Sequence, residues 1–147
     1  MFLQLLIGTG MIGLTVVLHA LSLDAIIRHL RWLEKTVLHR VQHLPWKPVT
    51  VAAVVLSIFS VNVMEIWIWA GLYFLIGAFP DFESALYFST TALTTVGFGD
   101  VMPAHDWKLL GAIEGANGFM LFGWSTAFTF EILSQLYRKE NSGVKRV

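Results

Sequence analysis

The chain has 147 residues, of which 56% are hydrophobic and 14% are charged, and its mean hydropathy is +0.66. A soluble domain of this length could not cover so much apolar surface, so the composition indicates a membrane protein. The formal net charge of zero gives no reason to expect nucleic acid as a partner, and the lack of cysteine excludes disulfides and thiolate metal sites.

The first hydrophobic stretch runs from about Phe2 to Leu23 and is long enough to cross a bilayer, which takes about 20 apolar residues. It lacks a basic n-region and a clear cleavage site, so we expect a retained transmembrane helix and not a signal peptide. Gly8, Gly10 and Gly13 match the G-x-G-x-x-G pattern of dinucleotide sites, but no strand precedes them. We interpret these small residues as a surface that a neighbouring helix approaches closely.

The segment from Ser22 to Leu44 predicts a separate amphipathic helix, capped by Ser22 or Asp24 and stopped by Pro45 and Pro48. Its apolar residues recur at steps of three or four and its basic residues lie off that stripe, which is typical of a helix in the cytoplasmic membrane interface. A gating or lipid-sensing role and a passive connection both stay open. The candidate contacts to anionic lipid are Arg28, Arg31, Lys35 and Arg40.

His39 and His43 lie one turn apart in this segment. Two histidines without a third ligand are more typical of solvated side chains than of a metal site, so we expect no metal there.

Two further stretches are long enough to span a bilayer, from Val49 to about Phe79 and from about Trp107 to Tyr137. Between them lies a shorter apolar segment, Glu83 to Leu93. It is too short to cross the membrane and too apolar to lie in water, which favours a re-entrant helix surrounded by protein.

The basic residues predict the orientation of these spans. They gather between the first two spans and after the third, whereas Lys108 lies alone on the other side. The positive-inside rule therefore places the C-terminus in the cytoplasm and the N-terminus outside, in a multi-pass protein of the cell membrane.

Residues 94–100 read TTVGFGD, with ALYFSTTAL directly before them and a hydrophobic helix after them. Glycine permits the backbone angles that turn a row of carbonyl oxygens toward one axis, and a dehydrated potassium ion needs a ring of such oxygens. In these flanks the motif resembles the selectivity filter of tetrameric potassium channels. The resemblance covers about the last two-thirds of the chain, in the order helix, pore loop, helix.

The resemblance implies an all-α membrane protein with three transmembrane helices, a re-entrant pore helix and a filter, assembled with four-fold symmetry. It implies a pore domain at residues 49–147, preceded at 1–48 by a transmembrane helix and the basic amphipathic helix. One chain has one pore loop, so three identical subunits are expected as partners, with membrane lipid around them. Potassium ions would bind in the filter, without an organic cofactor. The expected filter residues are Thr95, Val96, Gly97, Phe98 and Gly99.

The residues expected to support this filter depart from the commonest family pattern. Phe98 stands where tyrosine is usual and has no hydroxyl, Tyr87 and Phe88 stand where tryptophan is frequent, and Thr91 stands where some members have a carboxylate beside the aspartate that matches Asp100. We therefore expect packing, not hydrogen bonding, to hold the filter at this level.

The third span has one face at helical spacing that we expect to line the pore: Met120, Gly123, Ala127, Glu131 and Gln135. Phe128 beside it is a candidate constriction, and Gly118 and Gly123 are candidate bend points. Ordinary packing is the alternative for all three.

Three acids lie within the spans, where an unpaired carboxylate is costly. Glu131 is expected to face an aqueous vestibule. Glu114 is expected behind the pore helix as a support of the filter, with Thr90, Thr91 and Asn117 as candidate partners. Glu65, near Asn62, must face protein, and its partner is not predicted. Structural hydrogen bonding is favoured over proton-coupled transport for Glu65 and Glu114.

Together these features predict passive, potassium-selective conduction through a homotetramer, and no enzyme. The alternatives are a weakly selective cation channel, a potassium transporter subunit or a non-conducting membrane subunit.

Overall fold

The computed structural model of the chain describes residues 1–36 and 46–143, and all regular structure in this part is helical. The predicted histidines His39 and His43 and the basic residue Arg40 lie outside the described residues. The four α-helices are α1 (Phe2–Thr36), α2 (Trp46–Leu75), α3 (Phe82–Leu93) and α4 (Lys108–Gly143), and a short 3₁₀ helix, η1 (His105–Trp107), precedes α4.

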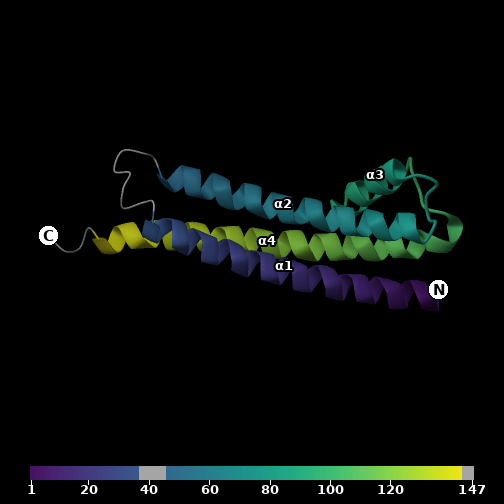
Figure 1. The fold of residues 1–147 in the computed structure, drawn as a ribbon, viewed down its shortest axis with the longest axis horizontal. Helices are drawn as coiled ribbons and strands as arrows, with labels where there is room; N and C mark the ends of the chain where they lie inside the picture. Colours follow the sequence, from purple (N-terminus) through teal and green to yellow (C-terminus); the bar gives the residue numbers. More distant parts are fainter. Residues whose placement is uncertain (37–45, 144–147) are drawn as a thin grey trace.

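The three long helices lie side by side, and the short α3 packs at one end of them (Figure 1). The N-terminus lies at the end where α3 is found, and the C-terminus lies at the opposite end. Helix α1 contacts both α2 and α4, and α3 packs against both α2 and α4. The first helix is therefore a packed part of the bundle.

Helix α1 corrects the prediction of a separate amphipathic helix from Ser22. It runs without interruption from Phe2 to Thr36, so no helix begins at Ser22 or Asp24. A potential capping residue inside a run of good helix formers does not end a helix when the helical backbone hydrogen bonds continue past it. Asp24 instead accepts from Arg28 one turn later, at 2.8 Å on the exposed surface.

Two helices have the length and apolar composition of membrane spans: α1 over Phe2–Trp32 and α2 over Pro48–Leu75. Helix α4 has 36 residues, so it is about 54 Å long and exceeds the roughly 30 Å hydrocarbon core of a bilayer. Its sequence contains Glu114, Asn117 and Glu131, which lower its mean hydropathy.

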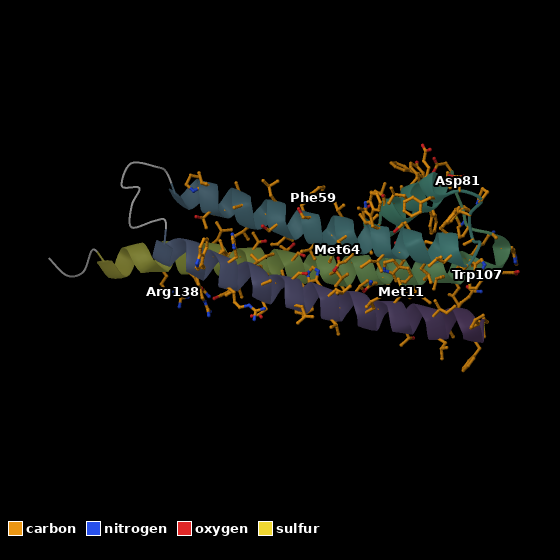
Figure 2. The ribbon with its side chains drawn as sticks, viewed as in Figure 1. Met11, Phe59, Met64, Asp81, Trp107 and Arg138 are labelled. Carbon is orange, nitrogen blue, oxygen red and sulfur yellow. The ribbon has the colours of Figure 1, made fainter. Side chains whose placement is uncertain are left out.

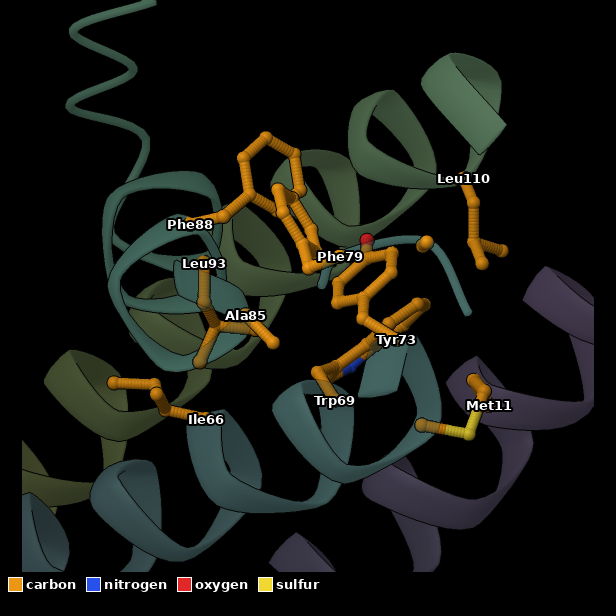
Figure 3. Close-up of a cluster of buried hydrophobic side chains, with 10 residues drawn as sticks. Met11, Ile66, Trp69, Tyr73, Phe79, Ala85, Phe88, Leu93 and Leu110 are labelled. Carbon is orange, nitrogen blue, oxygen red and sulfur yellow. The ribbon is translucent and has the colours of Figure 1, made fainter. Parts of the chain in front are cut away.

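The main core lies where α3 meets the long helices (Figure 3). Aromatic rings dominate it: Tyr73 contacts Phe88 edge-on at 5.3 Å between ring centroids, and Phe79 lies 5.2 Å from Phe88. Met11 adds a contact from α1, and Leu110 one from α4. Away from this end, many side chains of the long helices point outward, as Phe59 does (Figure 2).

Glycines on α4 let α3 lie close to it. A Cβ atom at Gly118 would lie 1.9 Å from the carbonyl oxygen of Leu93, and one at Gly111 would lie 2.6 Å from the Phe88 ring. Gly118, which was a candidate bend point, is therefore a packing position at the end of α3. On α1, Gly8 contacts Ile113 in the same way, but Gly10 and Gly13 have open space around them, so the predicted close approach holds only at Gly8.

Candidate functional site

The N-terminus of α3 is capped by its preceding residue. Asp81 is extended and accepts from the Ser84 backbone N–H at 2.7 Å and from the Ser84 hydroxyl at 2.9 Å. These bonds lower the pKa of the exposed Asp81 carboxyl. The cap fixes where the helix begins and thus where its C-terminal end delivers the TTVGFGD segment.

After α3 ends, the chain is held against the last helical turn. The N–H of Thr95 donates to the carbonyl oxygen of Ala92 at 2.9 Å, and the N–H of Gly97 donates to that of Thr91 at 3.0 Å. Thr95, Gly97 and Gly99 have positive φ values of 61°, 55° and 77°, and Thr95 is the only non-glycine residue of the described chain with this geometry. A β-branched residue rarely adopts positive φ, and such backbone strain is typical of functional sites.

The segment from Thr95 to Asp100 is exposed in the single chain. Val96 is 54% exposed and Phe98 is 71% exposed, although both are apolar. The side of the loop that bears the strained backbone thus faces away from the chain's own core.

Tyr87 and Asp100 correct the expectation that only packing holds this level. The Tyr87 hydroxyl donates to Oδ2 of Asp100 at 2.8 Å, so a hydrogen bond joins α3 to the end of the TTVGFGD segment. This bond lowers the pKa of the Asp100 carboxyl and raises that of the Tyr87 hydroxyl. Tyr87 therefore supports this level with a hydrogen bond, where the sequence predicted only packing of aromatic rings. Phe88 points the other way, into the aromatic core.

Glu114 lies behind α3, but its partners differ from those predicted. Its side chain is fully buried and accepts from the Tyr73 hydroxyl at 2.8 Å and from the Ser89 hydroxyl at 2.6 Å. Thr90 and Thr91 instead donate to backbone carbonyls within α3. The reason is helical geometry, because Ser89 shares the buried face of α3 with Ala85 and Leu93, whereas Thr90 faces outward.

Asn117, the third candidate partner of Glu114, bonds to α1. Its side-chain amide donates to Oγ1 of Thr15 at 2.8 Å. Thr15 in turn donates to the backbone carbonyl of Met11 at 2.9 Å.

The residues expected to line the pore lie along α4, and all five are exposed in the single chain: Met120, Gly123, Ala127, Glu131 and Gln135. Glu131 accepts from the Gln135 side chain at 2.7 Å. Phe128 is half-buried and packs against the cluster of Leu23, Val54 and Ile58, so packing, and not a constriction, describes it.

Glu65 faces protein, as expected, and its partner is a residue that sequence analysis missed. Oε1 of Glu65 lies 2.9 Å from Nδ1 of His19 on α1, and both side chains are fully buried. The available signal was that the first predicted span contains a histidine, His19, and the second a glutamate, Glu65, and such residues tend to pair within a membrane. Tyr73 and Ser89 were also missed, since hydroxyls in apolar helices carry little signal of their partners.

In the described part of the chain, no three His, Asp or Glu side chains gather as a metal site. The arrangement is instead a strained loop at the end of a short helix that packs with one face against two long helices.

Residues 49–135, more than half of the chain, match a protein family described as ion channel. The chain belongs to this family. No curated protein and no solved structure matches it. The family match indicates a membrane protein that conducts ions passively. The matched residues cover α2, α3, the TTVGFGD segment and most of α4, whereas α1 lies outside the match.

Proposed function

We propose that the channel is a homotetramer that conducts potassium selectively, with the TTVGFGD segment as its filter. The observation that carries this proposal is the backbone of that segment, in which every second residue from Thr95 to Gly99 has positive φ. In an ordinary extended strand, successive carbonyls point to opposite sides. Alternation of negative and positive φ turns them toward the same side instead, as a row of ion ligands requires.

A single row of oxygens surrounds a potassium ion on one side only. Four chains around an axis would complete each ring, with the carbonyls of Thr95, Val96, Gly97 and Phe98 and the Thr95 hydroxyl as ligands. The exposure of this segment in one chain supports the proposal, since it leaves the ligand row free to meet its copies. Gly99 would end the row, and Asp100 and Tyr87 would hold its outer end.

The remaining parts of the channel follow from this assignment. Helices α1, α2 and α4 would cross the membrane, and α3 would enter it from outside with its C-terminal end toward the central cavity. The partial negative charge at that helix end favours a cation. The exposed face of α4 from Met120 to Gln135 would line the cavity and the inner mouth. Residues 49–147 would form the pore domain and residues 1–48 an additional unit.

The orientation is also part of the proposal. The N-terminus and the pore loop would face outward, because basic residues concentrate at the other end of the helices. Arg28 and Arg31 are exposed near the C-terminal end of α1, where they would contact anionic lipid.

A reversal-potential measurement tests selectivity most directly. The purified channel is placed in a planar bilayer between solutions that contain potassium and sodium at unequal concentrations on the two sides. We expect a reversal potential close to the potassium equilibrium value. A reversal potential near zero would instead indicate a weakly selective cation channel, and lack of current would favour a transporter subunit or a non-conducting subunit.

A further inference from the structure

Three buried polar side chains from three helices meet away from the filter: His19 on α1, Glu65 on α2 and Ser125 on α4. Their exposed fractions are 0%, 0% and 6%. Nδ1 of His19 lies 2.9 Å from Oε1 of Glu65, and Nε2 lies 3.2 Å from the Ser125 hydroxyl oxygen. We call these three residues the His19 cluster. Its imidazole uses both ring nitrogens to join α1 to the two other long helices.

Buried interhelical hydrogen bonds of this kind are unusual in a helix as apolar as α1. Polar groups at membrane depth are costly unless they are paired. The Asn117–Thr15 bond adds a second buried polar contact between α1 and α4. Such groups within a membrane indicate a functional site by default.

The His19 cluster can gain or lose a proton without changing its geometry. One proton lies between Nδ1 of His19 and the Glu65 carboxylate in either state. At Nε2, a neutral imidazole accepts from the Ser125 hydroxyl, whereas an imidazolium donates to the Ser125 oxygen. A serine hydroxyl rotates to serve either role, so the same contact holds both states.

The two states differ in buried charge. With the proton bound, the imidazolium and the carboxylate sum to zero. Without it, one negative charge remains among three helices, and the second carboxylate oxygen of Glu65 is buried without a hydrogen-bond partner. A buried net charge is strongly unfavourable, so release of the proton weakens the contact of α1 with α2 and α4.

Among the described residues, no other charged side chain faces the His19 cluster and could replace this proton. From α2 the facing titratable group is Glu65, and from α4 the facing groups are the uncharged Ser125 and Trp124. Asp24 and Arg28 on α1 pair with each other on the exposed surface. The other acids of α4 have their own partners, Glu114 with Tyr73 and Glu131 with Gln135.

We propose that His19 and Glu65 form a proton-binding site through which α1 acts on α4, so that conduction depends on pH. Ser125 lies two positions from both Gly123 and Ala127, which lie on the face proposed to line the pore, and Trp124 is the direct neighbour of Gly123. A shift of α4 at the cluster therefore moves that face. The expected effect on conduction rests on the proposed channel function, whereas proton binding by His19 and Glu65 does not.

Proton binding is measured first, by ¹⁵N NMR of histidine-labelled protein in liposomes from about pH 4.5 to about pH 9. We expect one imidazole signal, absent in His19→Gln, to change between the doubly and singly protonated forms in this range. Glu65→Gln should alter this change, because the Glu65 carboxylate is the partner of Nδ1. His105→Gln is the matched control, since His105 is an exposed residue whose loss leaves the cluster intact. A His19 signal in one form throughout would overturn the proton-binding site.

Potassium flux from the same liposomes tests the coupling between proton binding and conduction. Wild-type flux should change by about fivefold or more over this range, the usual size of a coupling between two sites. His19→Gln and Glu65→Gln should have flat profiles, Ser125→Ala a reduced response, and His105→Gln the wild-type profile. A flat wild-type profile, or an unchanged response in His19→Gln, would overturn the coupling. Lack of flux at every pH would contradict the channel function, while the NMR result would still decide whether the proton site exists.

A reversible disulfide tests whether α1 transmits the effect. A Cβ atom at Gly8 would lie 2.8 Å and 2.9 Å from side-chain atoms of Ile113, so cysteines at these two positions are close enough to bond. The chain has no other cysteine. The oxidised Gly8→Cys/Ile113→Cys protein should have a flat pH profile, and reduction should restore the wild-type profile. Full pH dependence in the oxidised form would overturn the role of α1.

Discussion

At the scale of single residues, the positive φ values of Gly97 and Gly99 decide what these positions tolerate. In the single chain, a Cβ atom at either glycine would have open space around it, so the expected penalty comes from the backbone. An L-residue in the left-handed region costs about 1–2 kcal/mol. The strained segment would then relax toward ordinary extended geometry and lose its row of oxygens.

We therefore expect Gly97→Ala and Gly99→Ala to abolish potassium flux while the helical fold is retained, as measured by flux assay and circular dichroism. Gly10→Ala is the matched control, because Gly10 is a helical glycine with equally open surroundings. Its flux should equal that of the wild type. Normal flux in Gly97→Ala would contradict the filter assignment.

Tyr87 and Asp100 form the other residue-scale contact with a testable consequence. The Tyr87 hydroxyl lowers the pKa of Asp100, so the bond contributes stability above the ordinary pKa of an aspartate and loses it as pH falls through the lowered value. Tyr87→Phe should therefore shorten the open time of single channels at neutral pH, and its difference from the wild type should shrink in acid. The same substitution in an Asp100→Asn background should have a smaller effect. Equal effects in both backgrounds would show that the two residues are not coupled.

At the scale of the helices, Glu114 joins three elements. It lies on α4 and accepts from Tyr73 of α2 and Ser89 of α3, and the Ser89 hydroxyl oxygen also lies 2.9 Å from the backbone carbonyl oxygen of Ile66. The carboxylate thus fixes the back of the short helix that positions the TTVGFGD segment. Removal of one partner from such a buried network costs about 1–3 kcal/mol.

Glu114→Ala should therefore lower the unfolding temperature and shorten channel open times, while Glu114→Gln, which keeps one acceptor oxygen, should be milder. Asp106→Ala controls for the loss of a carboxylate from an exposed position. If Glu114→Ala has the unfolding temperature and open times of the wild type, Glu114 does not support the pore loop.

How far the helices follow from the sequence depends on the kind of signal. The apolar stretches predicted α2, α3 and the start of α4 to within a few residues, because hydrophobic length and turn residues are local properties, whereas α4 continues past the predicted end at Tyr137 to Gly143. The sequence analysis did not predict that α1 continues through Ser22. A capping residue has an effect only where the backbone already leaves the helical conformation. The sequence analysis also missed the partners of Glu114 and Glu65. These partners depend on which face of each helix contacts the neighbouring helix, and the periodicity of a single helix does not reveal which faces meet.

At the scale of the whole molecule, the long helices give the channel two chemically different ends. The pore-loop end has the exposed carboxylates of Asp81, Asp100 and Asp106, and the opposite end has the basic residues Arg28, Arg31 and Arg138 together with Glu131. In the proposed tetramer, four copies of Glu131 would ring the inner mouth. A ring of negative charge raises the local concentration of cations, and salt screens this effect.

Glu131→Gln should therefore lower outward potassium current at low ionic strength, and the difference from the wild type should decrease as salt is added. Single-channel conductance measured over a range of potassium concentrations gives both effects. Asp106→Asn is the matched control, because Asp106 is an exposed carboxylate at the opposite end, and its loss should leave outward current unchanged. Glu131 also accepts from Gln135, so Gln135→Ala separates the charge from that bond and should keep most of the wild-type current. If Glu131→Gln and the wild type conduct equally at low salt, the carboxylate faces away from the ion path, and the proposed pore-lining face of α4 must be rotated accordingly.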